Sequence, residues 1–178
     1  MLRHPERLSE LNDNPQVTLL DGDLTNPTDV IQATKDANLI WSAVVDHDQT
    51  NRPTKNIIAA AKLNRVERVV ETSLLGLYNE VPGEFGDWNR DYCFNGDPTG
   101  TTAVLADQLL AESGLTYTTL RLPWLNDRPE VNYTLTHRHD QFVGVSGSRR
   151  SIADPSLGAN DSLGIGDPTT EGATRPVY

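Results

Sequence analysis

The chain has 178 residues, of which 37% are hydrophobic and 22% are charged, and this composition is typical of one soluble domain with enough apolar material for a core. Its formal net charge of -10 gives phosphate backbones and anionic lipid surfaces little long-range attraction, so we expect neither a nucleic acid nor a membrane as partner. The single cysteine, Cys93, cannot form an internal disulfide, and the first residues do not resemble a secretory signal. We therefore expect a cytoplasmic protein.

The first half of the chain alternates runs typical of strands with runs typical of helices. This alternation predicts an α/β fold, with a parallel sheet covered by helices on both faces. Asn26 and Pro27 supply an N-cap and a proline at the first helical position. The elements predicted here are a strand at 16–20, a helix at 27–34, a strand buried on both faces at 37–45, a helix at 53–63 and a strand at 66–72.

The second half is less regular. Residues 75–100 contain five glycines and two prolines and predict a long loop, which we interpret as a lid or substrate wall. Further on, the sequence predicts a helix at 101–113 ended by Gly114, a strand at 117–122, a broken helix at 149–160 and a short strand at 162–165. We treat 1–178 as a single domain, with 126–178 as its less regular C-terminal portion.

Four blocks carry a resemblance to a known family: VTLLDGDLTNP at 17–27, NIIAAAK at 56–62, VERVVETS at 66–73 and SGLTYTTLRLP at 113–123. Their order and spacing resemble the atypical short-chain dehydrogenases of the NmrA-like, NAD(P)H-binding kind, and 162–178 resembles the C-terminal tail of the lactobacillus-type SDR oxidoreductases. The resemblance implies a Rossmann-like three-layer αβα fold with a parallel sheet, and NADP or NAD as cofactor.

In that family the fold opens with a strand, a G-x-x-G-x-x-G turn and a helix whose backbone N–H groups hold the pyrophosphate. The chain contains no such motif, and residues 2–8 resemble the end of the second strand instead. The resemblance therefore implies that 1–178 is a single, partial NAD(P)-binding domain, an N-terminally truncated fold that lacks the first strand and the glycine-rich helix. We expect it to bind the dinucleotide more weakly than a complete fold does. The uncovered sheet edge predicts marginal stability or self-association.

Ten residues resemble the family's remaining cofactor contacts, near the carboxyl ends of strands. They are Arg3 for the adenosine 2′-phosphate, Asp23 and Leu24 for the adenine ring, Ser42, Ala43 and Val44 for the ribose, Thr72 and Ser73 beside the nicotinamide, and Pro123 with Trp124 under that ring. Other interpretations stay open. Arg3 could be a solvated arginine at the terminus, and Asp23 could be a turn aspartate that caps the next helix. The small residues Ser42, Ala43 and Val44 could serve packing alone.

Short-chain dehydrogenases use a tyrosine as proton donor and a lysine four residues on that lowers the pKa of the tyrosine. By alignment, these positions fall near Thr99 and Ala103, neither of which is an acid near neutral pH. A standard carbonyl reductase is therefore not expected. Tyr78, Tyr92 and Ser73 are alternative proton donors in the predicted loop, although packing is the commoner role of a loop tyrosine.

Hydride transfer to a flavin or quinone needs little acid–base help from the protein, because the cofactors carry the chemistry. The preferred hypothesis is thus an NAD(P)H-dependent oxidoreductase acting on a small-molecule acceptor of that type. The alternatives are a non-catalytic, NmrA-like dinucleotide-sensing protein and an inactive truncated copy. We expect no metal site, because His137, His139 and Asp140 have neither a cysteine nearby nor a regular element to hold them.

Overall fold

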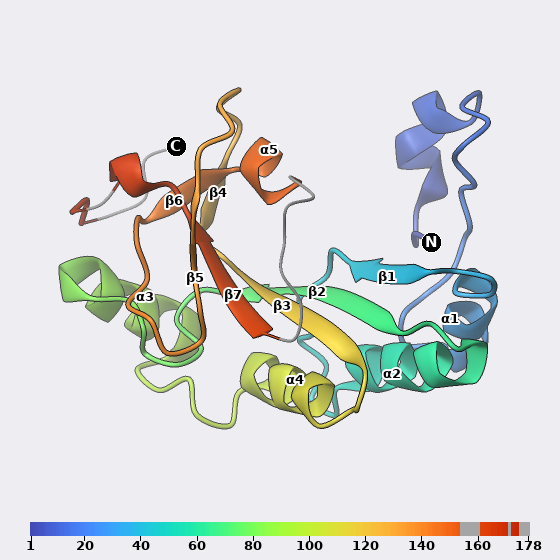
Figure 1. Ribbon diagram of the computed structural model, residues 1–178, viewed down its shortest axis with the longest axis horizontal. Helices are drawn as coiled ribbons and strands as arrows, with labels where there is room; N and C mark the ends of the chain where they lie inside the picture. Colours follow the sequence, from blue (N-terminus) through green and yellow to red (C-terminus); the bar gives the residue numbers. More distant parts are fainter. Residues whose placement is uncertain (154–160, 171, 175–178) are drawn as a thin grey trace.

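The computed structural model describes residues 1–153, 161–170 and 172–174, which form a sheet flanked by helices (Figure 1). Its elements in chain order are η1 (Pro5–Leu11), α1 (Pro27–Ala33), β1 (Leu39–Ser42), α2 (Arg52–Asn64), β2 (Arg68–Leu74), α3 (Gly83–Phe94), α4 (Thr102–Ala111), β3 (Thr116–Leu122), β4 (Trp124–Asn126), β5 (Thr134–Thr136), β6 (Ser146–Ser148), α5 (Arg149–Ile152), β7 (Asp161–Gly166) and η2 (Pro168–Thr170).

The main sheet has the strand order β1-β2-β3-β7-β5. Strands β1, β2, β3 and β7 are parallel, whereas β5 pairs with β7 in the antiparallel direction. Strands β4 and β6 form a separate parallel pair. Helix α3 lies beyond the carboxyl ends of the parallel strands (Figure 1). In an open α/β sheet these ends are where ligands bind, so α3 borders the expected site.

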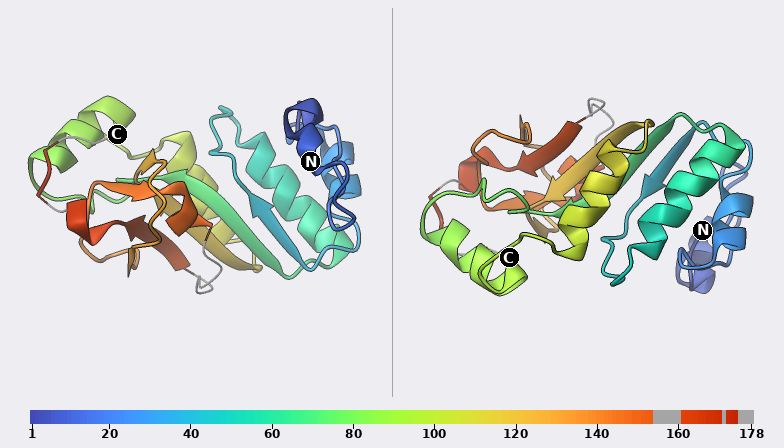
Figure 2. Two further views of the ribbon diagram at one scale, coloured as in Figure 1. Left: turned by 90° about the horizontal axis from the view of Figure 1, so that it is seen from above. Right: turned by 90° about the horizontal axis from the view of Figure 1, so that it is seen from below.

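Helices flank both faces of the sheet, which confirms the predicted Rossmann-like αβα arrangement. Helices α1, α2 and α4 cover one face (Figure 2), where Ile57, Val69 and Leu110 belong to one buried apolar cluster. On the other face, the short helix α5 contributes Ile152 to a second cluster that includes Leu120 of β3. Among the described residues, no helix is both long enough and apolar enough to cross a membrane.

Several predicted elements are confirmed with small shifts of their ends. Helix α1 begins at Pro27, and the Asn26 side chain accepts a hydrogen bond of 3.0 Å from the Thr28 N–H, as an N-cap does. Helices α2 and α4 and strands β2, β3 and β7 lie where the sequence places them. Of the helix predicted at 149–160, α5 occupies only the first turn. Residues 154–160 of that helix, and residues 171 and 175–178 of the predicted C-terminal tail, lie outside the described residues.

Three predictions are wrong. Residues 16–20 form no strand, and the only pairing here is a parallel bridge between Leu2 and Asp21, because no neighbouring strand extends the ladder among the described residues. The predicted loop at 75–100 contains the 12-residue helix α3, whose aromatic side chains pack on neighbouring elements despite its glycines. Strand β1 is covered on one face only, with Leu39 and Trp41 pointing away from the helices.

The free edge of β1 predicts self-association. Strand β1 pairs only with β2 within the described part of the chain, and the side chains of Leu39 and Trp41 on its open face are 43% and 40% exposed. An unpaired apolar edge is a template for a strand from a second copy, so we propose that two chains pair through β1.

Light scattering over a concentration series should show a dimer that Trp41→Lys converts to a monomer, since an edge lysine opposes strand pairing. Leu63→Lys, at a 63% exposed position on α2, is the matched control and should leave the dimer intact. A native chain that is monomeric with a sharp thermal transition at every concentration would contradict this proposal.

Candidate functional site

Strand β1 ends beside the middle of β2, because its last residue, Ser42, pairs with Glu71, and β2 continues to Leu74. Immediately after Ser42, Ala43 and Val44 are exposed, with Val44 at 50%. A ribose could approach these two exposed residues at the end of β1.

The pair predicted beside the nicotinamide lies deeper. Thr72 and Ser73 are each 5% exposed, near the carboxyl end of β2 and opposite Leu120 and Arg121 of β3. A ligand at this edge would therefore contact the strand end mainly through its backbone and the tips of these two side chains.

A second group lies before α1. The Asp23 carboxylate accepts hydrogen bonds of 2.8 Å from both the N–H and the hydroxyl of Thr25, and these bonds hold the pKa of Asp23 below its usual value, with smaller contributions from Arg3 and Arg52. Asp23 does not cap helix α1, because Asn26 does so. The carboxylate instead fixes the turn in which it lies.

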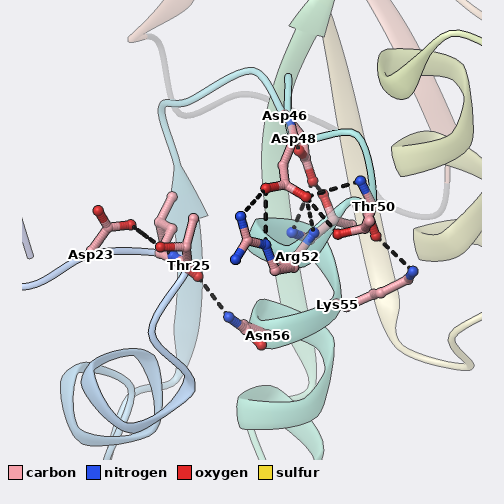
Figure 3. Close-up of polar contacts among 10 residues, drawn as sticks. Asp23, Thr25, Asp46, Asp48, Thr50, Arg52, Lys55 and Asn56 are labelled. Atoms are coloured by element: carbon pink, nitrogen blue, oxygen red, sulfur yellow. Dashed lines mark hydrogen bonds and ion pairs between the residues drawn. The ribbon is translucent and has the colours of Figure 1, made fainter.

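Figure 3 shows how the same corner is built from the start of α2. Asp48 accepts hydrogen bonds of 2.9 and 2.7 Å from Nε and Nη2 of Arg52, which hold the pKa of the Asp48 carboxyl far below its usual range. The Leu24 carbonyl accepts a 2.8 Å bond from the Asn56 side chain, which joins the loop before α1 to α2. The structure thus brings Asp23, Leu24 and the exposed guanidinium groups of Arg3 and Arg52 to one corner.

Sequence reasoning missed Arg52. An aspartate four residues before an arginine at a helix start, with proline at the next position, is the pattern that could have revealed it, because the carboxylate positions the guanidinium at the first turn. The corner places the guanidinium groups of Arg3 and Arg52 beside the carboxylates of Asp23 and Asp48, where the sequence predicts the adenosine end of the cofactor.

The remaining predicted pair is at the end of β3. Pro123 is buried and separates β3 from β4, whereas Trp124 is half-buried. The Trp124 indole N–H donates a 3.1 Å hydrogen bond to the Asn89 side chain, which in turn donates a 3.1 Å bond to the Leu75 carbonyl. Helix α3 and the end of β2 are thereby tied to Trp124.

A buried acidic group lies where β1 ends beside β2. The Thr54 hydroxyl is 2.7 Å from the Asp46 carboxylate and 2.9 Å from Oε1 of Glu71. The single hydroxyl proton serves one of these contacts, and the Thr54 N–H also donates to Asp46. Burial raises the pKa of Glu71 to about 8, so its carboxyl is mostly protonated at neutral pH.

Two tyrosines that the sequence offers as proton donors have different surroundings. The Tyr78 hydroxyl donates to the buried Asp107 carboxylate, which also forms a 3.0 Å ion pair with Arg138, so Tyr78 is held in a packed network. Tyr92 is not in a loop but on α3, with 69% of its surface exposed. Helix α4 carries neither a tyrosine nor a lysine.

Arg121 has a structural position. Its guanidinium is fully buried, forms a 2.5 Å ion pair with Glu80, and donates to the carbonyl oxygens of Thr136, His137 and Ser162. It therefore joins β3 to the loop before α3 and to β5 and β7. Among the described residues, no group of three or more histidine, cysteine, aspartate or glutamate side chains is placed to hold a metal ion.

Fold and site together describe a Rossmann-like protein of the short-chain dehydrogenase kind. The family model described as NAD(P)H-binding matches residues 1–159, and the chain therefore belongs to that family. A search of curated proteins finds no significant match.

Solved structures with similar folds agree with this assignment. A wide-type short-chain dehydrogenase/reductase from Veillonella parvula DSM 2008 in complex with NADP is 27% identical, with a TM-score of 0.79 over 95% of this chain and 80% of that chain. A Rossmann-fold NAD(P)-binding family protein from Shigella flexneri is 25% identical, with a TM-score of 0.73 over 99% and 82%. An anaerobillin reductase from Escherichia coli O157:H7 is 18% identical, with a TM-score of 0.66 over 97% and 84%, and shares the fold.

NAD(P) is the cofactor that this family binds, and the residues present fit it in part. The corner offers the Arg3 guanidinium for an adenosine phosphate and the Asp23 carboxylate as an acceptor for the adenine amine. The ends of β1, β2 and β3 offer a strand edge for the nicotinamide half of the cofactor. A glycine-rich turn for the pyrophosphate does not occur within the described part of the chain.

Proposed function

We propose that the chain is an NAD(P)H-dependent oxidoreductase that reduces a small acceptor of the flavin or quinone type. The observation that carries the proposal is the convergence of three strand ends, an exposed guanidinium corner and a half-buried tryptophan at one edge of the sheet, in a member of the NAD(P)H-binding family.

The residues at this edge have separate proposed roles. Arg3 would face the adenosine 2′-phosphate, and Asp23 with Leu24 would contact the adenine ring, because all three lie at the corner before α1. Ser42, Ala43 and Val44 would lie along the ribose. Thr72, Ser73, Pro123 and Trp124 would surround the nicotinamide, since β2 and β3 are adjacent and their ends lie together.

The type of acceptor follows from the proton donors that are missing at the carboxyl ends of the strands. When bound, the dinucleotide supplies a hydride. Tyr78 donates its proton to Asp107, and α4 has no tyrosine and lysine pair, so neither position offers the general acid that a short-chain dehydrogenase uses for an alkoxide product. An acceptor that stabilises the incoming charge in its own conjugated ring, and takes its proton from water, suits this site.

The absence of the tyrosine and lysine pair from α4 also favours a second function, that of a non-catalytic dinucleotide-sensing protein. Consumption of NADPH in the presence of an added quinone, followed by absorbance, separates the two functions, because a sensor binds NADPH without oxidising it. We also propose a cytoplasmic location, because the single cysteine, Cys93, is a free, half-buried thiol and cannot form an internal disulfide.

Arg3→Ala should lower the affinity for NADPH about tenfold and change the affinity for NADH little, because only NADPH carries the 2′-phosphate that a guanidinium binds. Calorimetric titration with each dinucleotide measures both values. Arg7→Ala removes a neighbouring exposed arginine and serves as the control, with both affinities expected at the native level. If Arg52→Ala, and not Arg3→Ala, abolishes the preference for NADPH, the assignment of Arg3 is wrong.

A further inference from the structure

Three aromatic rings form a column along one face of α3. Phe85, Trp88 and Tyr92 follow the spacing i, i+3 and i+7, which places them on one side of a helix. The ring centroids of Phe85 and Trp88 are 6.0 Å apart with planes at 29°, and those of Trp88 and Tyr92 are 5.2 Å apart at 19°. The rings are therefore stacked from one end of the column to the other.

The column runs from the core to the surface. Phe85 is 4% exposed, Trp88 is half-buried and Tyr92 is 69% exposed. One face of the Tyr92 ring rests on Trp88, so the exposed area belongs mainly to its other face and its edge. An aromatic stack that ends in an open ring face can accept one more planar ring at little conformational cost.

Trp124 connects this column to the proposed cofactor edge. Its ring centroid lies 5.2 Å from that of Trp88 and 5.6 Å from that of Tyr92, with planes tilted by 45° and 59°. The hydrogen bond from its indole N–H to Asn89 fixes this orientation. Because Trp124 follows the end of β3, a ring stacked on Tyr92 would lie next to the strand ends where the nicotinamide is proposed.

The charges around the column select among planar ligands. Helix α3 carries the carboxylates of Glu84, Asp87 and Asp91 against the single guanidinium of Arg90, which pairs with Asp87. This negative surface repels a phosphate, so an uncharged ring system suits it better than a flavin mononucleotide does.

Resting on the reductase function proposed above, we propose that Trp88, Tyr92 and Trp124 form the acceptor site, and that its ligand is an uncharged planar ring system of the quinone class. Tyr92 supplies the open ring face, Trp88 supports it from below, and Trp124 closes the side toward the dinucleotide.

The test measures binding of menadione, an uncharged naphthoquinone, to the native chain with NADP present in its oxidised form, by equilibrium dialysis. Tyr92→Ala should weaken menadione binding about two- to tenfold, the range expected for the loss of one stacked aromatic pair. Tyr92→Phe keeps the ring and should bind as the native chain does. Leu63→Ala, at another exposed apolar position, is the control for surface truncation and should have no effect. Flavin mononucleotide should bind more weakly than riboflavin, because only the former carries a phosphate.

The outcomes separate this inference from the reductase function. Menadione binding that is equal in the native chain and in Tyr92→Ala, or absent in both, would overturn the acceptor site, even if NADPH is oxidised with another acceptor. Tyr92-dependent binding without NADPH oxidation would support the site and contradict the reductase. If Tyr92→Ala instead turns a dimer into a monomer in light scattering and leaves menadione binding unchanged, the column is an interface between copies and the inference fails.

Discussion

Glu71→Gln should stabilise the protein at neutral and alkaline pH and remove the main part of its stability loss on the alkaline side. The Glu71 carboxyl is 3% exposed and has one polar neighbour at hydrogen-bond distance, the Thr54 hydroxyl. Glutamine matches the shape of the protonated acid, and its amide can donate to the same hydroxyl oxygen without ever becoming charged in the core.

The direction of the pH effect follows because Glu71 binds its proton more tightly in the folded state than in the unfolded chain. Burial raises the pKa of Glu71 from 4.5 to about 8, so the folded state holds the proton over a range in which the unfolded chain has released it. Stability from this group is complete below pH 4.5, falls as pH rises, and is lost once pH has passed through about 8. At pH 7 the difference is about 3 kcal/mol, which corresponds to a rise in Tm of roughly 5–10 °C for the glutamine variant.

Denaturant unfolding from pH 4.5 to above pH 8 measures the effect. The native chain and the variant should be equally stable at the acidic end and diverge as pH rises. Glu67→Gln, at an exposed position just before β2, removes the same charge without burial and should follow the native curve. Parallel curves for the native chain and Glu71→Gln would show that Glu71 does not hold its proton in the folded state.

Arg121→Met should cost about 3–5 kcal/mol of unfolding free energy, the usual cost of breaking a buried ion pair from one side. The substitution leaves the buried Glu80 carboxylate without its guanidinium, and it removes the donor to three backbone carbonyls. Since Glu80 also accepts bonds from the N–H groups of Gly76 and Tyr78, the loop that leads to α3 should loosen as well.

Thermal and denaturant unfolding measure the loss, and the double variant Glu80→Gln with Arg121→Met should recover part of it because no unpaired charge remains. The control is Arg149→Met, which breaks an exposed ion pair with Asp127 and should cost less than about 1 kcal/mol. A native-like stability for Arg121→Met would mean that the buried pair contributes nothing to the fold. If Arg121→Met does not fold at all, Arg121→Lys, which retains the charge and one donor, should fold with an intermediate stability.

The sequence predicted the parts of the fold whose signals are local. Proline and asparagine at the start of α1, apolar spacing in α2 and α4, and β-branched runs in β2 and β3 all act over a few residues, and these elements lie where expected. The strand at 16–20 failed for a different reason, since a strand exists only where a neighbour pairs with it, and pairing is not local information.

Helix α3 was missed because its stabilisation is tertiary. Its glycines and polar residues indicate a loop, yet Phe85 packs into a core with Leu75 and Val81, and Asn89 bonds to Trp124 and to the end of β2. The acceptor site proposed here depends on this helix, and so the sequence could predict Trp124 as a site residue but neither Trp88 nor the column that it joins.

The candidate cofactor site was predicted in part. The sequence named residues of all three strand ends, and the structure brings Arg3, Asp23 and Leu24 to one corner. It did not name Arg52, although Asp48 four residues earlier and Pro53 directly after it form a pattern that indicates an arginine held at a helix start. The sequence also did not indicate that Glu71 is a neutral acid, because its pKa is raised by burial, and that burial follows from the packing of helices on the sheet.

The central claim is that this chain binds NADPH at the carboxyl ends of β1, β2 and β3. Calorimetric titration of the native chain with NADPH tests it most directly. The account predicts one site with a dissociation constant in the micromolar range, tighter for NADPH than for NADH. A titration that shows no binding of either dinucleotide at millimolar concentration would contradict the claim and, with it, the reductase function.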